Sequence, residues 1–259
     1  MAYTESTTRA YVEERFPRAS RGEQNKIVTD WMTKHQQSEG IAADFEKRVG
    51  SLAGLRVLDA GSGNGGISIA LAKHGAHPEG VDIEEDLVAI ARAEASEQGV
   101  VATFTYYEGT VLPFEDKTFD AAFSVSVIEH VEHPVQYFKE ILRVLKPGGV
   151  LYLAFPNKLV PIETHTGLFA LSYLPAPIAR WYARAMHHNP VEDNNLHFYT
   201  YWKMRSFLRQ ASGDRAWSIR EERGSATGGV KGTVKNLLRI FGIPHQAFLP
   251  HVMLIVEAS

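Results

Sequence analysis

A glycine-rich turn is the first feature of this sequence that indicates chemistry. Residues 61–66 read GSGNGG; they follow the apolar run 55–60 and precede a helical pattern. Glycine lets the backbone turn tightly and lets a ligand approach main-chain N–H groups without meeting a Cβ atom. Asp59 lies directly before the turn, and Asp82 ends the next expected strand. This pattern predicts a nucleoside-containing cofactor, with Asp82 binding the ribose hydroxyls.

The same residues satisfy two cofactor motifs. Gly61, Gly63 and Gly66 fit the G-x-G-x-x-G pattern of dinucleotide-binding proteins, whereas residues 59–65 fit the acidic-x-G-x-G-x-G loop of S-adenosylmethionine-dependent methyltransferases. The glycines alone do not distinguish the two. Asp59 favours the second motif, because a pyrophosphate would meet a negative charge there, whereas a zwitterionic sulfonium cofactor can use a carboxylate.

Strands and helices alternate from residue 55 to residue 155, which predicts a parallel sheet with helices on both of its faces. The expected strands lie at 55–60, 77–83, 101–107, 119–127 and 150–155. The expected helices between them lie at 67–74, 87–98 and 135–145. A Pro- and aromatic-rich stretch then interrupts the pattern from Pro156 to about Asn195. The remaining expected elements are a helix at 201–210, a strand at 217–222, a helix at 233–241 and a strand at 252–257.

Five short motifs along residues 57–157 carry a resemblance to a known family. They are 57–65 (VLDAGSGNG), 80–83 (GVDI), 112–114 (LPF) before Phe119-Asp120, 127–131 (VIEHV) and 144–149 (VLKPGG). With these motifs in this order, the sequence resembles the class I methyltransferases, and among them the ubiquinone-biosynthesis methyltransferases. The resemblance implies an α/β fold: a doubly wound, Rossmann-like sheet of seven mostly parallel strands, with an antiparallel last strand and a helical cap. It also implies S-adenosylmethionine as the cofactor.

The resemblance further implies which residues bind that cofactor. The implied set is Asp59, Gly61, Ser62, Gly63, Asp82, Ile83, Glu108, Gly109, Thr110, Ser124 and Ser126. Asp59 would hold the amino group, Gly61 and Gly63 would pass beneath the methionyl part, Asp82 would bind the ribose, and Ile83 would pack on the adenine.

Two short segments complete that set. Residues 108–110 occupy the loop that contacts the adenine edge, where relatives often carry an Asp in place of Glu108. Ser124 and Ser126 close the fourth strand and would face the sulfonium.

Three histidines are the candidate catalytic residues. A hydroxyl acceptor must lose a proton as the methyl group arrives, and imidazole titrates near neutral pH. His130 follows the fourth strand, His165 lies in the interrupting stretch, and His197 precedes the next helix. We predict that the base is one of these three, with His130 the first choice.

A metal ion is the alternative way to assist deprotonation. Some relatives place Glu-x-x-Glu-His after the fourth strand and add a later His to bind a divalent cation. Here Ser126 replaces the first Glu, so that Glu129, His130 and His197 remain. Because the loss of an anionic ligand weakens the affinity for a hard cation, no metal site is predicted.

Two segments outside the motifs have a surface character. Residues 178–186 place apolar and aromatic side chains at helical spacing, with arginines on other faces. We interpret this segment as a lid helix packed on the sheet; the alternative is a helix that lies on a membrane or holds a hydrophobic acceptor. Residues 200–241 carry nine Lys/Arg and three Asp/Glu, which indicates a solvated surface or one that attracts an anionic lipid or a phosphorylated substrate.

Composition excludes several other classes. The 259 residues are 44% hydrophobic and 22% charged, contain no cysteine and have a formal net charge of −3. The lack of cysteine excludes disulfides, a thiolate nucleophile and Cys-ligated metals. The near-neutral charge gives no reason to expect a nucleic-acid partner. No apolar run reaches the roughly 20 residues of a membrane span, and residues 1–30 lack a signal core, so a cytoplasmic location is expected, with peripheral membrane contact left open.

These observations predict O-methylation of a small or lipid-like molecule. N- or C-methylation is the alternative within the class. An NAD-dependent oxidoreductase and a catalytically silent cofactor-binding module are the alternatives outside it. The expected organisation is a helical cap over residues 1–50 and a methyltransferase domain over 51–259, with a lid insertion at 156–197.

Overall fold

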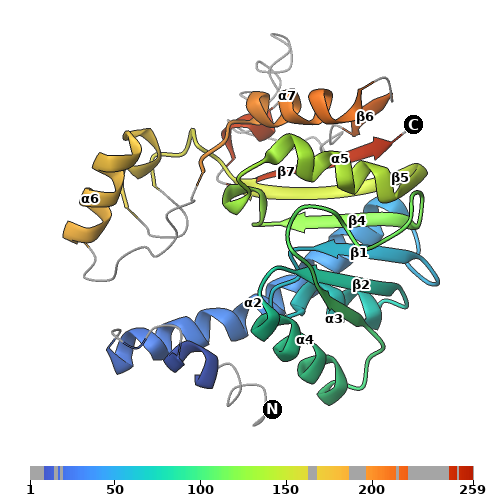
Figure 1. Ribbon diagram of the computed structural model, residues 1–259, viewed down its shortest axis with the longest axis horizontal. Coiled ribbons are helices and arrows are strands. Elements are labelled where there is room, and N and C mark those ends of the chain that lie inside the picture. Colours follow the sequence, from blue (N-terminus) through green and yellow to red (C-terminus); the bar gives the residue numbers. More distant parts are fainter. Residues whose placement is uncertain are drawn as a thin grey trace, which may run out of the picture. The chain divides into compact units, whose positions relative to one another are not determined.

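A seven-stranded sheet organises the protein, with the strand order β3-β2-β1-β4-β5-β7-β6 (Figure 1). The computed structural model describes residues 9–14, 17, 20–162, 168–186, 197–213, 216–220, 245–249 and 251–258. Contacts divide the chain into two compact units. The first is Met1–Phe123 with Arg143–Gly149, and the second is Ser124–Leu142 with Val150–Ser259.

Parallel strands form the sheet of the first unit. The strands are β1 (Arg56–Ala60), β2 (His77–Asp82), β3 (Thr103–Tyr106) and the larger part of β4 (Phe119–Val125). Strand β1 pairs in parallel with both β2 and β4, and β2 pairs in parallel with β3. In register, Asp59 lies opposite Gly80 on one side and Phe123 on the other. The predicted parallel arrangement is confirmed for these strands.

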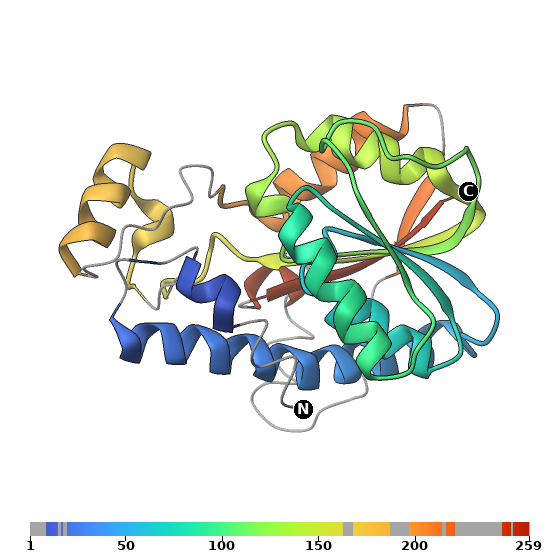
Figure 2. The ribbon, with the colours of Figure 1, turned by 60° about the horizontal axis from the view of Figure 1, so that its bottom comes forward.

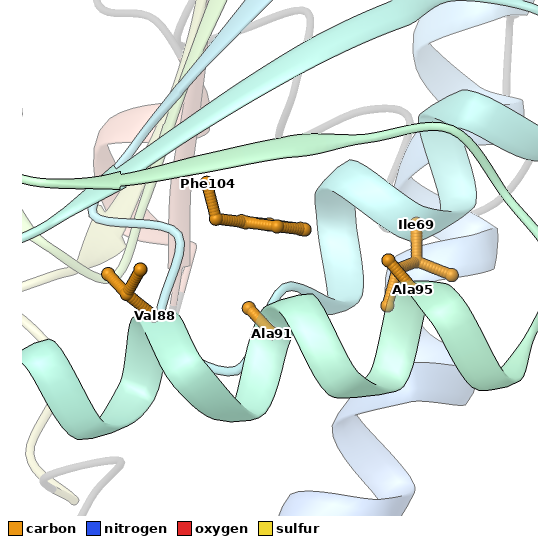
Figure 3. Close-up of a cluster of buried hydrophobic side chains, with 5 residues drawn as sticks. All are labelled: Ile69, Val88, Ala91, Ala95 and Phe104. Atoms are coloured by element: carbon orange, nitrogen blue, oxygen red, sulfur yellow. The ribbon is translucent and has the colours of Figure 1, made fainter.

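Two helices connect these strands and bury one face each. Helix α3 (Gly66–Lys73) follows β1, and α4 (Glu85–Glu97) follows β2. A cluster of buried side chains joins the two helices to β3: Ile69, Val88, Ala91, Ala95 and Phe104 (Figure 3). The Phe104 ring lies between its strand and the face of α4 that carries the small residues. This cluster sets the distance between the helices and the strand, because the burial of apolar surface stabilises it.

The N-terminal region is helical and packs within the first unit. Helix α2 (Arg21–Val49) contacts α3. Its Phe45 ring packs edge-on against the Phe123 ring, with a distance of 4.7 Å between the ring centroids. His74, at the end of α3, bonds Glu46 through Nδ1 at 2.7 Å and Glu39 through Nε2 at 2.9 Å. Figure 2 shows the short helix 9–14 beside α2.

The second unit contains the antiparallel part of the sheet. Strand β7 (His251–Ala258) lies between β5 (Leu145–Pro156) and β6 (Trp217–Arg220) and is antiparallel to both. The helices of this region are α5 (Pro134–Val144), α7 (Tyr201–Ser212) and the short η1 (Ile128–His130) and η3 (His245–Phe248). The predicted antiparallel last strand is confirmed. Strand β5 begins five residues earlier than expected.

The insertion after β5 forms its own small apolar cluster. Helix α6 (Ala176–Met186) packs on η2 (Leu171–Tyr173) through Ala183, which is buried together with Leu168 and Leu171. The segment 178–186 is helical as predicted. Its buried face packs with Leu168, Leu171 and Phe198, whereas the sequence predicts packing on the sheet. The helix expected at 233–241 lies outside the described residues. Within the described ranges, no helix combines the length and the apolar character that crossing a membrane requires.

Candidate active site

Asp82 organises the carboxyl end of β2. Its Oδ2 accepts a hydrogen bond from the Gly63 N–H at 2.8 Å, and its Oδ1 accepts one from the Glu84 N–H at 3.0 Å. The side chain is mostly buried, and this burial raises the pKa of Asp82 while the two N–H donors oppose the rise. The carboxylate is therefore fixed against the glycine turn.

Asp59 lies beneath the same turn and is only 1% exposed. Its Oδ2 accepts hydrogen bonds from the Ser68 N–H at 3.2 Å and from the Ser68 hydroxyl at 2.8 Å. Burial raises the pKa of Asp59 to about 6; the bonds from Ser68 lower it, and the charge of Asp82 adds to the rise. Asp59 thus fixes the first turn of α3, and it changes protonation close to neutral pH.

Four backbone N–H groups of the turn already have protein acceptors. The N–H groups of Gly61 and Ser62 both donate to the Val81 carbonyl at 2.9 Å, and that of Gly65 donates to the Ser62 carbonyl at 2.9 Å. The Gly63 N–H donates to the carboxylate of Asp82. A dinucleotide pyrophosphate binds through free N–H groups at such a turn. Because four of these groups are used internally, one of them by a carboxylate, the geometry disfavours a pyrophosphate.

The glycines of this region have two different reasons for being glycine. A Cβ atom on Gly65 would lie 2.9 Å from the Phe104 ring and the Ala91 side chain, and one on Gly80 would lie 2.6 Å from Phe104. These two positions serve packing. A Cβ on Gly63, whose φ is +52°, would meet no protein atom within 4 Å. The space above Gly63 is therefore open to a ligand.

The turn also holds a polar group that a cofactor can satisfy. The Oγ atom of Ser62 is buried and has no hydrogen-bond partner among the described residues. A buried hydroxyl without a partner costs free energy, so that a bound polar ligand is the expected compensation. Together with the open space above Gly63 and the fixed carboxylate of Asp82, this hydroxyl fits the amino-acid and ribose parts of S-adenosylmethionine.

An apolar platform follows Asp82. Ile83 is 59% exposed, which is unusual for a large aliphatic side chain at the end of a buried strand. A Cβ on Gly109 would lie 3.1 Å from the Ile83 side chain, so the loop 108–110 lies against it. The Tyr107 N–H donates to the Asp82 carbonyl at 3.0 Å and holds this loop in place. Glu108 and Thr110 are exposed beside it.

The two serines of β4 have different surroundings. Ser124 is fully buried, and its Oγ accepts a hydrogen bond from the Tyr137 hydroxyl of α5 at 2.8 Å. This contact gives Ser124 a packing role whether or not it meets a cofactor. Ser126 is partly exposed and has a φ of +55°, a left-handed conformation that is uncommon outside glycine. Contact of either serine with a sulfonium stays a prediction.

The structure brings two of the predicted catalytic segments together. The N–H of His197 donates to the carbonyl of Glu129 at 2.7 Å, so the segment before α7 lies against the residue that precedes His130. Both histidines are exposed. The ring of His197 stacks on that of Tyr199 with a centroid distance of 6.1 Å. His165, the third candidate, lies outside the described residues.

The carboxylate of Glu129 is buried next to His130. Within the described part of the chain, no group of three His, Cys, Asp or Glu side chains has the arrangement of a metal site. The expectation that no metal takes part stays a prediction.

Two tyrosines, one in each unit, did not stand out in the sequence. The Tyr11 hydroxyl donates to Glu84 Oε2 at 2.8 Å, so the N-terminal helix reaches the carboxyl end of β2. Tyr137 positions Ser124 from the first turns of α5. Neither residue belongs to a motif, and their partners lie 73 and 13 residues away in the sequence. Only the fold reveals them.

Comparison with known proteins agrees with this geometry. The family described as "Methyltransferase domain" matches residues 58–153. The "Ubiquinone biosynthesis O-methyltransferase" of Xylella fastidiosa (strain M23) is 30% identical over 206 residues, which cover 70% of this chain and 82% of that protein. The protein of the same name from Ruegeria pomeroyi is 30% identical over 167 residues, and the match spans 63% of each protein, less than two thirds of that relative.

The fold has solved counterparts. An S-adenosylmethionine-dependent methyltransferase from Mesorhizobium loti is similar with a TM-score of 0.59 and 17% identity, over 85% of this chain and 99% of that one. At this identity the likeness concerns the fold.

The sheet and its glycine turn define a nucleoside-binding α/β protein of the Rossmann-like type. Within that class, the chain belongs to the class I S-adenosylmethionine-dependent methyltransferases. It is a methyltransferase, and S-adenosylmethionine is its cofactor.

Proposed function

We propose that this enzyme methylates a hydroxyl oxygen of a small or lipid-like molecule, with His130 as the general base. The observation that carries the proposal is the hydrogen bond from His197 to the Glu129 carbonyl, which sets a second imidazole-bearing segment beside His130. The relatives named for ubiquinone biosynthesis, which are O-methyltransferases by name, support oxygen as the acceptor atom.

We assign each candidate residue one role in this methyl transfer. S-adenosylmethionine supplies a methyl group activated by a positive sulfur. Asp82 binds the ribose hydroxyls, Ser62 and Asp59 hold the amino-acid part, and Ile83 packs on the adenine. His130 accepts the proton of the acceptor hydroxyl as the new O–C bond forms and the S–C bond breaks. Alignment of the acceptor with the methyl group supplies the remaining acceleration.

The substitution His130→Gln tests the base. Glutamine keeps the size and polarity of the side chain but cannot accept a proton near neutral pH, so turnover should fall by about 100-fold or more. The pH dependence that belongs to the imidazole should disappear, while the affinity for S-adenosylhomocysteine stays unchanged. The matched control is His133→Gln, because His133 is an exposed histidine three residues further on.

The assay would measure S-adenosylhomocysteine release with catechol and with a farnesylated catechol as acceptors. Wild-type turnover and an unchanged pH profile in His130→Gln and in the equivalent variants of His165 and His197 would refute histidine catalysis. Alignment alone would then explain the transfer.

We further propose that the insertion binds a lipid-like acceptor at a membrane surface. Six large apolar side chains of this region are exposed: Ile162, Phe169, Tyr173, Ile178, Trp181 and Met186. Arg184 lies among them on α6 and is also exposed. Exposed aromatic and apolar side chains next to a cation suit the interface of an anionic membrane.

Vesicle co-sedimentation tests this part of the proposal. Wild-type protein should bind phosphatidylcholine vesicles that contain phosphatidylglycerol, and Trp181→Ser should weaken the binding. Val101→Ser is the control, because Val101 is an even more exposed apolar residue in the first unit. Equal binding of the wild type and both variants would contradict the proposal.

A further inference from the structure

A pocket of about 230 Å³ opens on the surface of the second unit, and no residue of the cofactor-binding set or of the candidate bases lines it. It is lined by Trp202, Arg205, Ser206 and Arg209 of α7 and by Trp217 of β6. The residues from α7 are spaced by three or four positions, so they share one face of the helix. The helix therefore contributes one indole and two guanidinium groups to the wall of the pocket, and the strand contributes a second indole.

The charge of this wall is uncompensated within the described residues. Helix α7 contains Lys203, Arg205 and Arg209 and no acidic residue. Arg205 contacts Tyr201, both by a hydrogen bond of 3.4 Å to its hydroxyl and over its ring at 5.7 Å, and neither contact neutralises its charge. No salt bridge joins either arginine to a described carboxylate.

Two like charges one turn apart weaken a helix unless an anion lies between them. Arginine pairs of this kind bind phosphate oxygens through several N–H groups at once. The arrangement therefore favours an anion at this face.

The two indoles add a requirement of shape. Trp202 is about half exposed and Trp217 is partly buried. Indole rings at the edge of a small pocket pack on flat rings, and stacking of this type adds affinity beyond buried area. The volume lies below the 300–1,000 Å³ that are typical of pockets for drug-sized ligands. The pocket therefore suits a ligand with one phosphate group and one ring.

We propose that this pocket is a second ligand site, which binds a phosphate monoester that carries a planar ring. Nucleoside monophosphates and aryl phosphates belong to this chemical class. The site shares no residue with the cofactor-binding set or with the candidate bases. Binding there does not depend on the reaction proposed above.

Phenyl phosphate is the probe for this site. Two of the four tryptophans of the chain line the pocket, so the binding can be followed by quenching of tryptophan fluorescence. The titration is done with S-adenosylhomocysteine present in saturating amount, which keeps the probe out of the cofactor site. Wild-type protein should show saturable quenching. Inorganic phosphate and phenol, which each carry half of the ligand, should bind at least about fivefold more weakly.

Variants identify the groups that bind. Arg209→Gln should raise the dissociation constant of phenyl phosphate about tenfold, because a charge-assisted pair of hydrogen bonds is lost. Trp217→Leu should abolish the advantage of phenyl phosphate over inorganic phosphate. Lys203→Gln is the matched control: it removes an exposed cation from the same helix outside the pocket and should change the constant less than twofold. Thermal unfolding of each variant confirms that it is folded.

Three results would overturn the proposal. The first is the absence of saturable quenching at 10 mM phenyl phosphate, a concentration set about tenfold above millimolar affinity. The second is an equal effect of Lys203→Gln and Arg209→Gln, which would indicate a diffuse surface charge. The third is equal affinity for inorganic phosphate and phenyl phosphate in the wild type.

Discussion

The residues assigned to the cofactor and those assigned to the acceptor differ in how firmly the protein holds them. In the first unit, Asp59 and Asp82 are buried, and each carboxylate accepts two hydrogen bonds from the chain. In the second unit, His130 and His197 are exposed at the ends of short segments. The first group is fixed before any ligand arrives, whereas the second can adapt to what it meets.

This difference follows from the chemistry of the two ligands. The cofactor is the same for every member of the family, so a preorganised set of donors and acceptors binds it at little entropic cost. Acceptors differ between members, and binding residues on loops and short segments vary without disturbing the core. The comparison predicts large effects from substitutions in the fixed group and smaller, more specific effects elsewhere.

The largest effect is expected from Gly63→Val. The valine side chain would fill the open space above the turn and impose a φ of +52° on a β-branched residue. S-adenosylhomocysteine binding, measured by calorimetry, should become undetectable, a loss of more than about 100-fold. Gly99→Val is the matched control, since Gly99 also has a positive φ and free space around it but lies after α4. Binding that survives in Gly63→Val would place the pocket elsewhere.

A smaller effect is expected from Asp82→Ala. The ribose hydroxyls lose a charged acceptor and Gly63 loses the anchor of its N–H, so the affinity for S-adenosylhomocysteine should fall by about 2 kcal/mol, or about 30-fold. Asp116→Ala serves as the control, because it removes an exposed carboxylate of the same unit. If the two variants bind equally well, Asp82 does not hold the ribose.

The pKa of Asp59 gives the fixed group a pH dependence. Above about pH 6 this carboxylate is charged and can hold the ammonium of the cofactor; below it the charge is lost. If only the charged form binds, the affinity for S-adenosylhomocysteine should fall about tenfold between pH 7 and pH 5. Asp59→Asn should bind weakly at both pH values, without this slope. A flat wild-type profile over this range would contradict the role of Asp59.

The pH dependence of stability that comes from Asp59 has the opposite sign to the pH dependence of cofactor affinity. Its pKa is raised in the folded protein, so its contribution to stability is fully present below the unfolded pKa and is lost as the pH rises through about 6. Protonation of Asp59 therefore stabilises the cofactor-free protein, although the same protonation weakens cofactor binding.

The smallest effect concerns the contact of α2 with α3. Bonds to Glu46 and Glu39 raise the pKa of His74, so the stability from this contact is fully present below pH 6.5 and is lost as the pH rises through the raised value. His74→Gln should lower the free energy of unfolding by about 1 kcal/mol or less at pH 6 and leave it nearly unchanged at pH 9. The exposed His77 gives the control variant His77→Gln. If His74→Gln lowers the free energy of unfolding equally at both pH values, His74 stabilises the contact by packing and not by its charge.

Most of the fold was predictable because its signals are local. The apolar run 55–60, the glycine turn and the acidic end at Asp82 predict one β-α-β unit, and the structure confirms its parallel pairing. The antiparallel β7 came from the family resemblance and not from the residues, since alternation along one strand does not fix its direction.

The site was predictable to a lesser degree. A motif predicts that Asp59 contacts the cofactor, but the hydrogen bond that Asp59 accepts from Ser68 depends on how α3 leaves the turn. Ser124 was expected to face the cofactor, and its burial against Tyr137 depends on the position of α5. The contact of Tyr11 with Glu84 and the pocket between α7 and β6 join residues that are distant or that lie on different elements. Such contacts follow from tertiary packing, which no local pattern encodes.

The most direct test of this account compares two cofactors on the unmodified protein. The turn uses four of its N–H groups internally and leaves space above Gly63, so it should bind S-adenosylhomocysteine and not a pyrophosphate. Calorimetric titration should show one site for S-adenosylhomocysteine with a dissociation constant of about 1–100 μM and no binding of NAD at about 1 mM. Binding of NAD with equal or greater affinity would contradict the account.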